Sequence, residues 1–173
     1  LTAVRDPLQM ITHHILDSLA IRPFLNGPNV LDIGSGAGLP GIPLAIARPQ
    51  YNFTLLDSNS KKTRFMIQAK GELELANVQV VHTRVEKYNP AQKFDTLVTR
   101  AFASLAEMVA AAQHLLAPDG EFLAMKGAYP GDELEQIPEP LRVLEVIELQ
   151  VPGLGERRHL VRMGVRMGRS TGE

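Results

Sequence analysis

A run of glycines stands where the sequence predicts that a strand gives way to a helix. Residues 32–38 read Asp-Ile-Gly-Ser-Gly-Ala-Gly and overlap the apolar segment 29–33, which has the pattern of a buried strand. Glycine adopts the backbone angles of a tight turn and lets a ligand lie against the main chain. In open α/β sheets, ligands bind at the carboxyl ends of strands. The segment therefore predicts a nucleotide-type site that includes Asp32, Gly34 and Gly36.

The glycine spacing discriminates between ligands. A dinucleotide fingerprint, G-x-G-x-x-G, would need glycine at the position held by Leu39. The pattern present, D-x-G-x-G-x-G, resembles the first motif of methyltransferases that use S-adenosylmethionine (SAM). SAM has a carboxylate, an ammonium and a sulfonium but no pyrophosphate, so Asp32 can attract its cationic parts while glycine amides approach the rest. The alternative is an ordinary glycine-rich turn between a strand and a helix.

An acidic residue follows the glycines at an informative distance. Asp57 comes about twenty residues after the turn, at the end of a second predicted strand. This is the spacing expected for a carboxylate that accepts hydrogen bonds from both ribose hydroxyls. Taken alone, Asp57 fits a strand-end turn equally well. Together with the glycine turn, it favours a ribose contact.

The elements that must position these residues alternate between strands and helices. Patterning predicts strands at 29–33, 52–56, 78–81, 94–99 and 121–126, then strands at 141–151 and 159–167 with no helix between them. Helices are predicted at 7–20, up to residue 47, at 60–75, at 104–116 and at 132–136, with a turn at 118–120. The fold class is α/β: a Rossmann-like class I SAM-dependent methyltransferase, with a mostly parallel seven-stranded sheet, one antiparallel strand and helices on both faces. Dehydrogenases usually keep the sheet parallel to its end, which makes that class a distant alternative.

Composition limits the chemistry and the number of domains. The 173 residues, 45% of them hydrophobic, fit a single domain spanning 1–173. The absence of cysteine excludes disulfides, thiolate metal sites and a cysteine nucleophile for pyrimidine C5 methylation. We expect no metal. No apolar run reaches membrane-spanning length, and we expect a cytoplasmic monomer without membrane contact.

The net charge of −1 means that any RNA contact must come from a local basic patch. Two clusters are candidates. One is Lys61, Lys62 and Arg64, and the other is the C-terminal stretch with Arg157, Arg158, Arg162, Arg166 and Arg169. The alternative for both is a solvated charged face.

The segment after the fourth predicted strand bears on which atom is methylated. Exocyclic amine methyltransferases carry a [D/N]-P-P-aromatic tetrad there, whereas this chain reads Thr99-Arg100-Ala101-Phe102. Guanine N7 has an in-plane lone pair and no proton to remove, so placement alone can suffice. O-methylation of a sugar or a small molecule also fits. Arg100, our candidate catalytic residue, could contact a carboxylate, a phosphate or a guanine edge, or it could be a surface arginine.

Taken together, these residues resemble the bacterial 16S ribosomal RNA guanine-N7 methyltransferases, the glucose-inhibited division protein B family. The resemblance covers nearly the whole chain, and the segments that carry it are residues 1–6, 14–18, 32–44, 56–58, 61–65, 84–86, 100–103, 126–127 and 156–161. The combination of Leu39-Pro40-Gly41 with the Arg100 segment is more specific than the glycine turn alone.

The resemblance implies a function and several site residues. It places SAM against Gly34, Leu39, the Val85-Glu86 pair and Arg100, with Val85-Glu86 beside the adenine. It implies methyl transfer to N7 of a guanine in the 530-loop region of 16S ribosomal RNA or the small ribosomal subunit. Lys126, at the carboxyl end of a predicted strand, joins Arg157 and Arg158 as a candidate RNA contact and fits a solvated strand-end lysine equally well. The family carries an N-terminal helical segment that we expect this chain to lack. A small-molecule methyltransferase and a non-catalytic RNA-binding module remain as alternatives.

Overall fold

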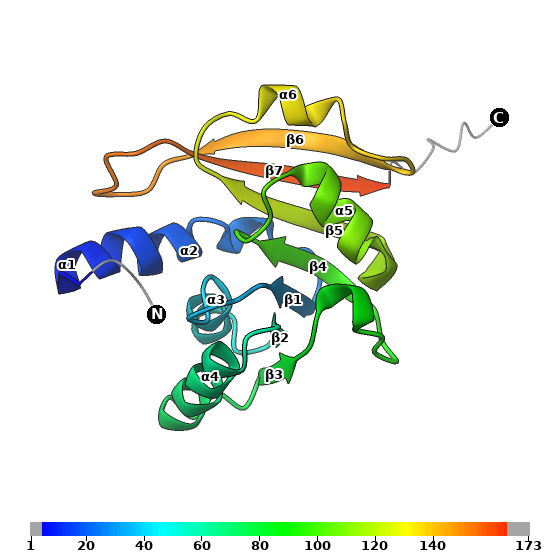
Figure 1. The fold of residues 1–173 in the computed structure, drawn as a ribbon. Coiled ribbons are helices and arrows are strands. Elements are labelled where there is room, and N and C mark those ends of the chain that lie inside the picture. The colour runs from blue at the N-terminus through cyan, green and yellow to red at the C-terminus, as the bar shows by residue number, and fades with distance from the viewer. Residues whose placement is uncertain (1–4, 166–173) are drawn as a thin grey trace.

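Seven strands form one mixed sheet in the computed structural model, which describes residues 5–165. The strands are β1 (Asn29–Ile33), β2 (Asn52–Asp57), β3 (Val78–His82), β4 (Phe94–Thr99), β5 (Leu116–Lys126), β6 (Leu141–Leu149) and β7 (Arg158–Val165). Their order in the sheet is β3-β2-β1-β4-β5-β7-β6 (Figure 1). Strand β7 runs antiparallel to both of its neighbours, and the pairings among β1 to β5 are parallel. The predicted mostly parallel sheet with one antiparallel strand is confirmed.

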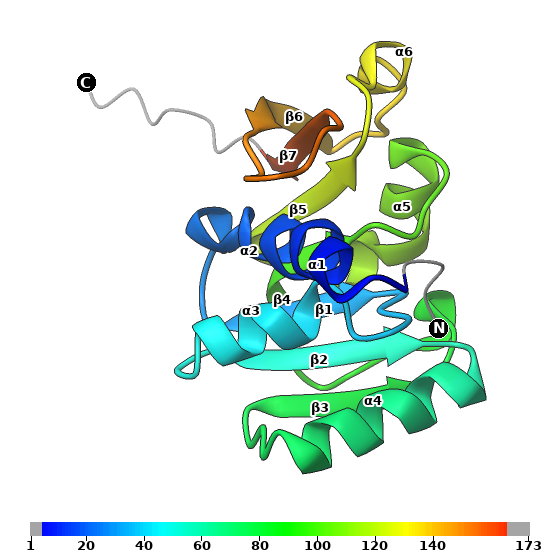
Figure 2. The same ribbon diagram turned by 90° about the vertical axis from the view of Figure 1, so that its left-hand side faces the viewer.

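Helices cover both faces of this sheet (Figure 2). Helices α3 (Gly41–Ala47) and α4 (Ser60–Glu72) pack on one face, and α5 (Leu105–Ala112) packs on the other, followed later by the short α6 (Gly131–Leu134). The N-terminal helix consists of α1 (Pro7–Met10), a π-helical stretch (Ile11–Leu16) and α2 (Asp17–Leu19). Its first turn is capped by Asp6, whose side chain accepts a hydrogen bond from the Leu8 amide.

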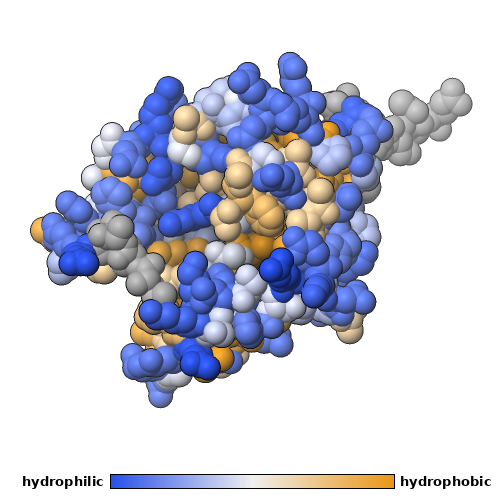
Figure 3. All heavy atoms as spheres, in the orientation of Figure 1, coloured by the Kyte–Doolittle hydropathy of each residue, from blue (hydrophilic) through white to orange (hydrophobic). Residues whose placement is uncertain are grey.

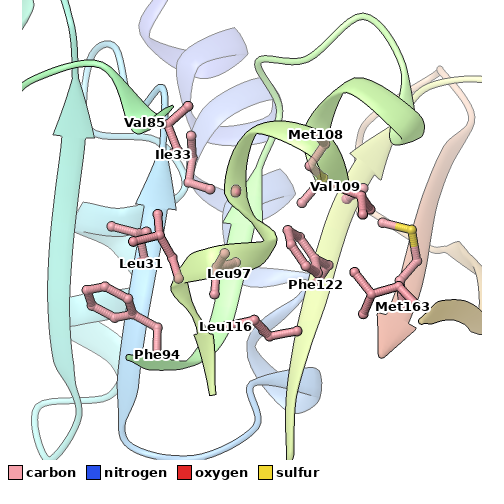
Figure 4. Close-up of a cluster of buried hydrophobic side chains, with 14 of the residues drawn as sticks. Leu31, Ile33, Val85, Phe94, Leu97, Met108, Val109, Leu116, Phe122 and Met163 are labelled. Atoms are coloured by element: carbon pink, nitrogen blue, oxygen red, sulfur yellow. The ribbon is translucent and has the colours of Figure 1, made fainter. Parts of the chain in front are cut away.

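The core is divided in two by the sheet because successive strand residues point to opposite faces. Leu31, Leu97 and Phe122 lie in the cluster under α5 (Figure 4), whereas Val30 and Val98 lie in the cluster under α3 and α4. All five side chains are buried. The near-continuous apolar runs in the sequence of β1 and β4 follow from this burial on both faces.

The structure differs from the sequence prediction around β5. The predicted turn at Pro118-Asp119-Gly120 lies inside the span of β5, which begins at Leu116 rather than at Glu121. The pairing with β4 jumps from Phe94–Leu116 to Thr96–Glu121, so the four residues 117–120 lie opposite Asp95 alone and bulge out of an otherwise continuous strand. Strand β6 ends at Leu149, two residues before the predicted end, and the predicted end of β7 at 167 lies outside the described residues.

Candidate functional site

The glycine turn joins β1 to α3 and has the geometry that the sequence predicts. Gly34, Gly36 and Gly38 have φ angles of 68°, 58° and 84°, values that side chains other than glycine rarely adopt. The carboxylate of Asp32 accepts a hydrogen bond of 2.8 Å from the Gly41 amide, at the first residue of α3. The amide of Gly34 donates to the Leu56 carbonyl at 2.8 Å. These bonds hold the turn against the ends of β1 and β2.

Asp57 connects the glycine turn with the beginning of α4. Its Oδ2 accepts a hydrogen bond of 3.0 Å from the Gly36 amide, and its Oδ1 accepts one of 2.8 Å from the Asn59 amide. The side chain of Asn59 in turn caps α4 by accepting from the Lys61 and Lys62 amides. A carboxylate offers about four lone-pair positions. Asp57 is therefore fixed in orientation and can still accept further hydrogen bonds.

A cavity opens at the carboxyl ends of β1, β2 and β4 and at the segment after β3. Its volume is about 290 Å³. Helical turn Val85–Lys87 forms one of its borders. The lining residues are Ile33, Gly34, Leu56, Asp57, Ser58, Thr83, Arg84, Val85, Glu86, Ala101 and Phe102. On the face of the molecule seen in Figure 1, apolar side chains gather near the centre and hydrophilic ones surround them (Figure 3).

The cavity unites four of the predicted cofactor residues, namely Gly34, Asp57, Val85 and Glu86. Gly36 joins them indirectly, through its hydrogen bond to Asp57. The other three predicted cofactor residues do not line the cavity. Asp32 is buried beneath the turn, Leu39 lies within it and donates its amide to the Ser35 carbonyl at 3.0 Å, and Arg100 follows β4 at the cavity's edge.

The carboxyl of Asp32 has a raised pKa. Burial raises the pKa of its carboxyl from 3.8 to about 7, and the positive charge of Arg100 acts in the opposite direction. The Ser35 side chain lowers the same pKa by hydrogen bonding to the carboxyl, but burial outweighs this effect. Within residues 5–165 the Asp32 carboxyl forms no ion pair, and burial of its charged form is costly. A cationic group placed at the glycine turn would offset this cost, which fits the ammonium of an amino-acid moiety.

Arg100 contacts a residue that the sequence analysis did not select. Its Nη1 lies 3.4 Å from Oδ2 of Asp17, and Nε of Arg158 lies 3.0 Å from Oδ1 of the same carboxylate. The Asp17 side chain is only 2% exposed. The structure therefore brings Arg100 and Arg158, predicted separately as cofactor and RNA contacts, to one buried acid.

The remaining predicted RNA contacts differ in their exposure and in whether they form ion pairs within the protein. Lys126 is mostly buried and lies 3.2 Å from the Glu133 carboxylate, and Arg157 is 70% exposed with Glu148 at 3.4 Å. Within residues 5–165, Lys61, Lys62 and Arg64 form no ion pair. Arg162 binds Glu121 and Glu145 across β5, β7 and β6, and Arg166 and Arg169 lie outside the described residues.

Sequence reasoning missed Ser58, Thr83 and Phe102 as lining residues. Each follows a predicted strand by a few positions, so the rule that ligands bind at the carboxyl ends of strands could have found them. Asp17 gave no such signal, because its partners Arg100 and Arg158 are distant in sequence.

A second cavity, of about 380 Å³, lies near the amino ends of β1 to β4. Asn29, Asn52, Asn77 and Lys93 are among its lining residues. Its lining includes neither the glycine turn nor the carboxylates of Asp32 and Asp57. The smaller cavity is therefore the better candidate for a functional site.

Comparison with known proteins places this chain in a family. The family model described as GidB, rRNA small subunit methyltransferase G, matches residues 1–161. The chain belongs to this family. The protein named ribosomal RNA small subunit methyltransferase G from Laribacter hongkongensis is 54% identical over 166 residues, which cover 96% of this chain and 80% of that protein. The protein of the same name from Nitrosococcus oceani is 54% identical, with 96% and 78% covered.

Solved structures support the fold of this methyltransferase family member independently. The glycopeptide N-methyltransferase MtfA, solved in complex with S-adenosylhomocysteine, matches with a TM-score of 0.75 at 12% identity, covering 96% of this chain and 90% of that one. At that identity the match shows the fold alone, a class I SAM-dependent methyltransferase fold. Among residues 5–165, no helix combines the length and apolar character that crossing a membrane would require.

Asp32 makes the stability of the protein depend on pH in a defined window. Because its pKa is about 7 in the fold against an ordinary 3.8, the folded state holds more protons between these values. The free energy of unfolding therefore falls as pH rises from about 4 to 7, by at most about 4 kcal/mol from this group. Asp32→Asn should remove this part of the decline.

Urea unfolding of both proteins at pH 4, 6 and 8 measures the effect. The variant should gain stability relative to the unmodified protein as pH rises. Parallel stability curves for the two proteins would show that Asp32 titrates normally.

Proposed function

We propose that this chain transfers a methyl group from SAM to N7 of a guanine in the 530-loop region of 16S ribosomal RNA. Family membership supports the reaction class and the ribosomal RNA substrate. The observation that carries the proposal is Asp57, which two backbone amides orient at the wall of a cavity beside the glycine turn. We further infer that the sheet and its helices constitute one catalytic domain.

The proposal implies one orientation of the donor in the cavity. Asp57 would accept hydrogen bonds from both ribose hydroxyls, and the apolar side chains of Val85 and Phe102 would border the adenine. The methionine moiety would then lie on the glycine turn, with its ammonium above the buried Asp32. Its carboxylate would be directed toward Arg100, whose guanidinium forms charge-assisted hydrogen bonds with carboxylates.

Methyl transfer to guanine N7 suits a site with few proton acceptors. When bound, SAM supplies a methyl group on a positively charged sulfur. The electron pair of the broken carbon–sulfur bond stays on the sulfur, and N7 donates its lone pair to the methyl carbon. The described cavity walls contain no histidine, and of their two carboxylates Asp57 is held by backbone amides. Guanine N7 needs no base because it carries no proton. The protein's contribution is then to orient N7 in line with the methyl group and to exclude water, which can supply roughly 7–11 kcal/mol.

Exposed basic residues near the cavity would hold the RNA backbone. Lys61 and Lys62 lie in the first turn of α4, three and four residues after the cavity residue Ser58. Lys61 and Arg64 are exposed. Phosphate contacts of this kind provide much of the affinity for RNA. Arg157 is a further candidate because of its exposure, whereas Lys126 and Arg158 would first have to exchange their carboxylate partners.

Mapping of modified nucleotides tests the proposed reaction. Purified protein and SAM are incubated with ribosomal RNA or small subunits that lack the modification, and nuclease fragments are weighed by mass spectrometry. We expect one added methyl group, on N7 of a guanine in the 530-loop region. Methylation confined to small metabolites, or RNA binding with no methylation, would contradict the proposal.

Gly34→Ala should weaken donor binding strongly. A Cβ at this position would lie 2.5 Å from the Cβ of Ala101, and its φ of 68° is strained for alanine. Calorimetric titration with S-adenosylhomocysteine should show affinity reduced at least tenfold. Gly71→Ala is the matched control, because a Cβ there meets nothing within 4 Å, and its affinity should be unchanged. Equal affinities in both variants would remove the glycine turn from the site.

Lys61→Ala should weaken RNA binding, with Lys70→Ala as the control from the last turn of the same helix. A lysine that contacts one phosphate contributes about one unit to the slope of log affinity against log salt concentration. Filter binding at several salt concentrations should show that slope reduced for Lys61→Ala alone. Identical slopes in the two variants would show that the beginning of α4 does not contact RNA.

A further inference from the structure

Asp17 is a buried acid with two arginine partners drawn from distant parts of the chain. It lies in α2, Arg100 directly follows β4, and Arg158 is the first residue of β7. Both carboxylate oxygens are used, Oδ2 by Arg100 at 3.4 Å and Oδ1 by Arg158 at 3.0 Å. The N-terminal helix thereby reaches two strand ends through one side chain.

Neighbouring contacts show that these segments are packed together around the acid. A Cβ on Gly153, in the connection between β6 and β7, would lie 2.9 Å from the side chain of Thr12 in the N-terminal helix. A Cβ on Gly127, after β5, would lie 3.7 Å from Nη1 of Arg158. These approaches bring the β6–β7 connection against the N-terminal helix and the end of β5 beside Arg158, and the Asp17 side chain is 2% exposed.

The charge balance of the cluster leaves a positive charge at the edge of the cavity. One carboxylate faces two guanidinium groups, and Arg158 has a second partner in Glu156 at 3.5 Å. Arg100 has only Asp17 as a charged partner within residues 5–165, and its side chain remains 33% exposed. Arg100 also lies near enough to Asp32 for its charge to oppose the raised pKa of that acid. Its guanidinium therefore contacts Asp17 directly, acts on Asp32 through its charge, and keeps donors available.

Burial of a charged cluster of this kind is not explained by stability alone. Desolvation of the ions offsets much of their attraction, so a buried ion pair often contributes little to the free energy of unfolding compared with apolar residues. It does fix geometry, because a carboxylate that holds a guanidinium removes most of the freedom of a long side chain.

We propose that Asp17 is a positioning residue that holds the guanidinium of Arg100 where it binds the carboxylate of the methyl donor, with Arg158 engaging its other oxygen. The inference rests on the proposed function, because it assumes that the donor lies on the glycine turn. Loss of the charge on Asp17 would leave two guanidinium groups that repel each other, and Arg100 would move away from the turn.

A truncated ligand distinguishes positioning from general structural support. S-adenosylhomocysteine carries the amino-acid carboxylate, whereas 5′-methylthioadenosine has the same adenosine and sulfur without it. Asp17→Asn should reduce the calorimetric affinity for S-adenosylhomocysteine at least tenfold and leave the affinity for 5′-methylthioadenosine within about twofold, since only the first ligand loses a charge-assisted hydrogen bond.

Glu121→Gln is the matched control. It also removes a carboxylate from an arginine of β7, since Glu121 binds Arg162 at 2.9 Å, but it lies outside the cluster and the cavity. It should leave both affinities unchanged. Thermal unfolding of both variants reports their stability. If Asp17→Asn does not fold, Asp17→Glu retains the charge on a longer side chain and should show the same selective loss in weaker form.

The outcomes separate this inference from the proposed function. Unmodified protein that fails to bind S-adenosylhomocysteine contradicts the proposed function itself. Unmodified protein that binds it, with Asp17 variants that bind it equally well or that lose both ligands by the same factor, overturns the positioning role of Asp17 and leaves the proposed function intact.

Discussion

The hydrogen bond between the Gly41 amide and the buried carboxylate of Asp32 closes the turn on which the site is built. It joins the last residues of β1 to the first residue of α3, so the glycines between them must complete the turn with positive φ angles. The closed turn presents the Gly36 amide to Asp57. The ends of two parallel strands are thereby fixed relative to each other, and the cavity forms beside them.

The charges around the cavity depend on the same arrangement. Asp32 and Asp17 are both buried acids, and Arg100, which follows β4, pairs with Asp17 and lowers the pKa of Asp32 through its charge. Asp17 has arginine partners on both oxygens, whereas Asp32 forms no ion pair within residues 5–165. This asymmetry makes the glycine turn receptive to a ligand with both a cationic and an anionic group, which an amino-acid moiety supplies.

Much of the fold could be predicted because local patterns determine it. The strand bounds of β1 and β4 match the prediction, since apolar runs flanked by turn residues are unambiguous there. The bulge in β5 could not be predicted, because Pro118-Asp119-Gly120 has the sequence of a turn and only pairing with β4 keeps it within a strand. Local preference was overridden by tertiary pairing.

The site was predicted in part for a similar reason. Gly34 could be predicted from the glycine motif and Asp57 from its spacing after the glycine turn. Val85-Glu86 was predicted from the family resemblance. The convergence of Asp17, Arg100 and Arg158 could not be found, because it depends on how the N-terminal helix packs against the ends of β4 and β7. Such contacts are set by the assembled fold rather than by any local pattern.

A crystal structure with S-adenosylhomocysteine would show where the donor binds. We expect density along the carboxyl ends of β1 and β2, with both ribose hydroxyls within hydrogen-bond distance of Asp57 and the amino-acid moiety over the glycine turn. Density in the cavity at the amino ends of the strands, or a glycine turn closed against the ligand, would contradict it.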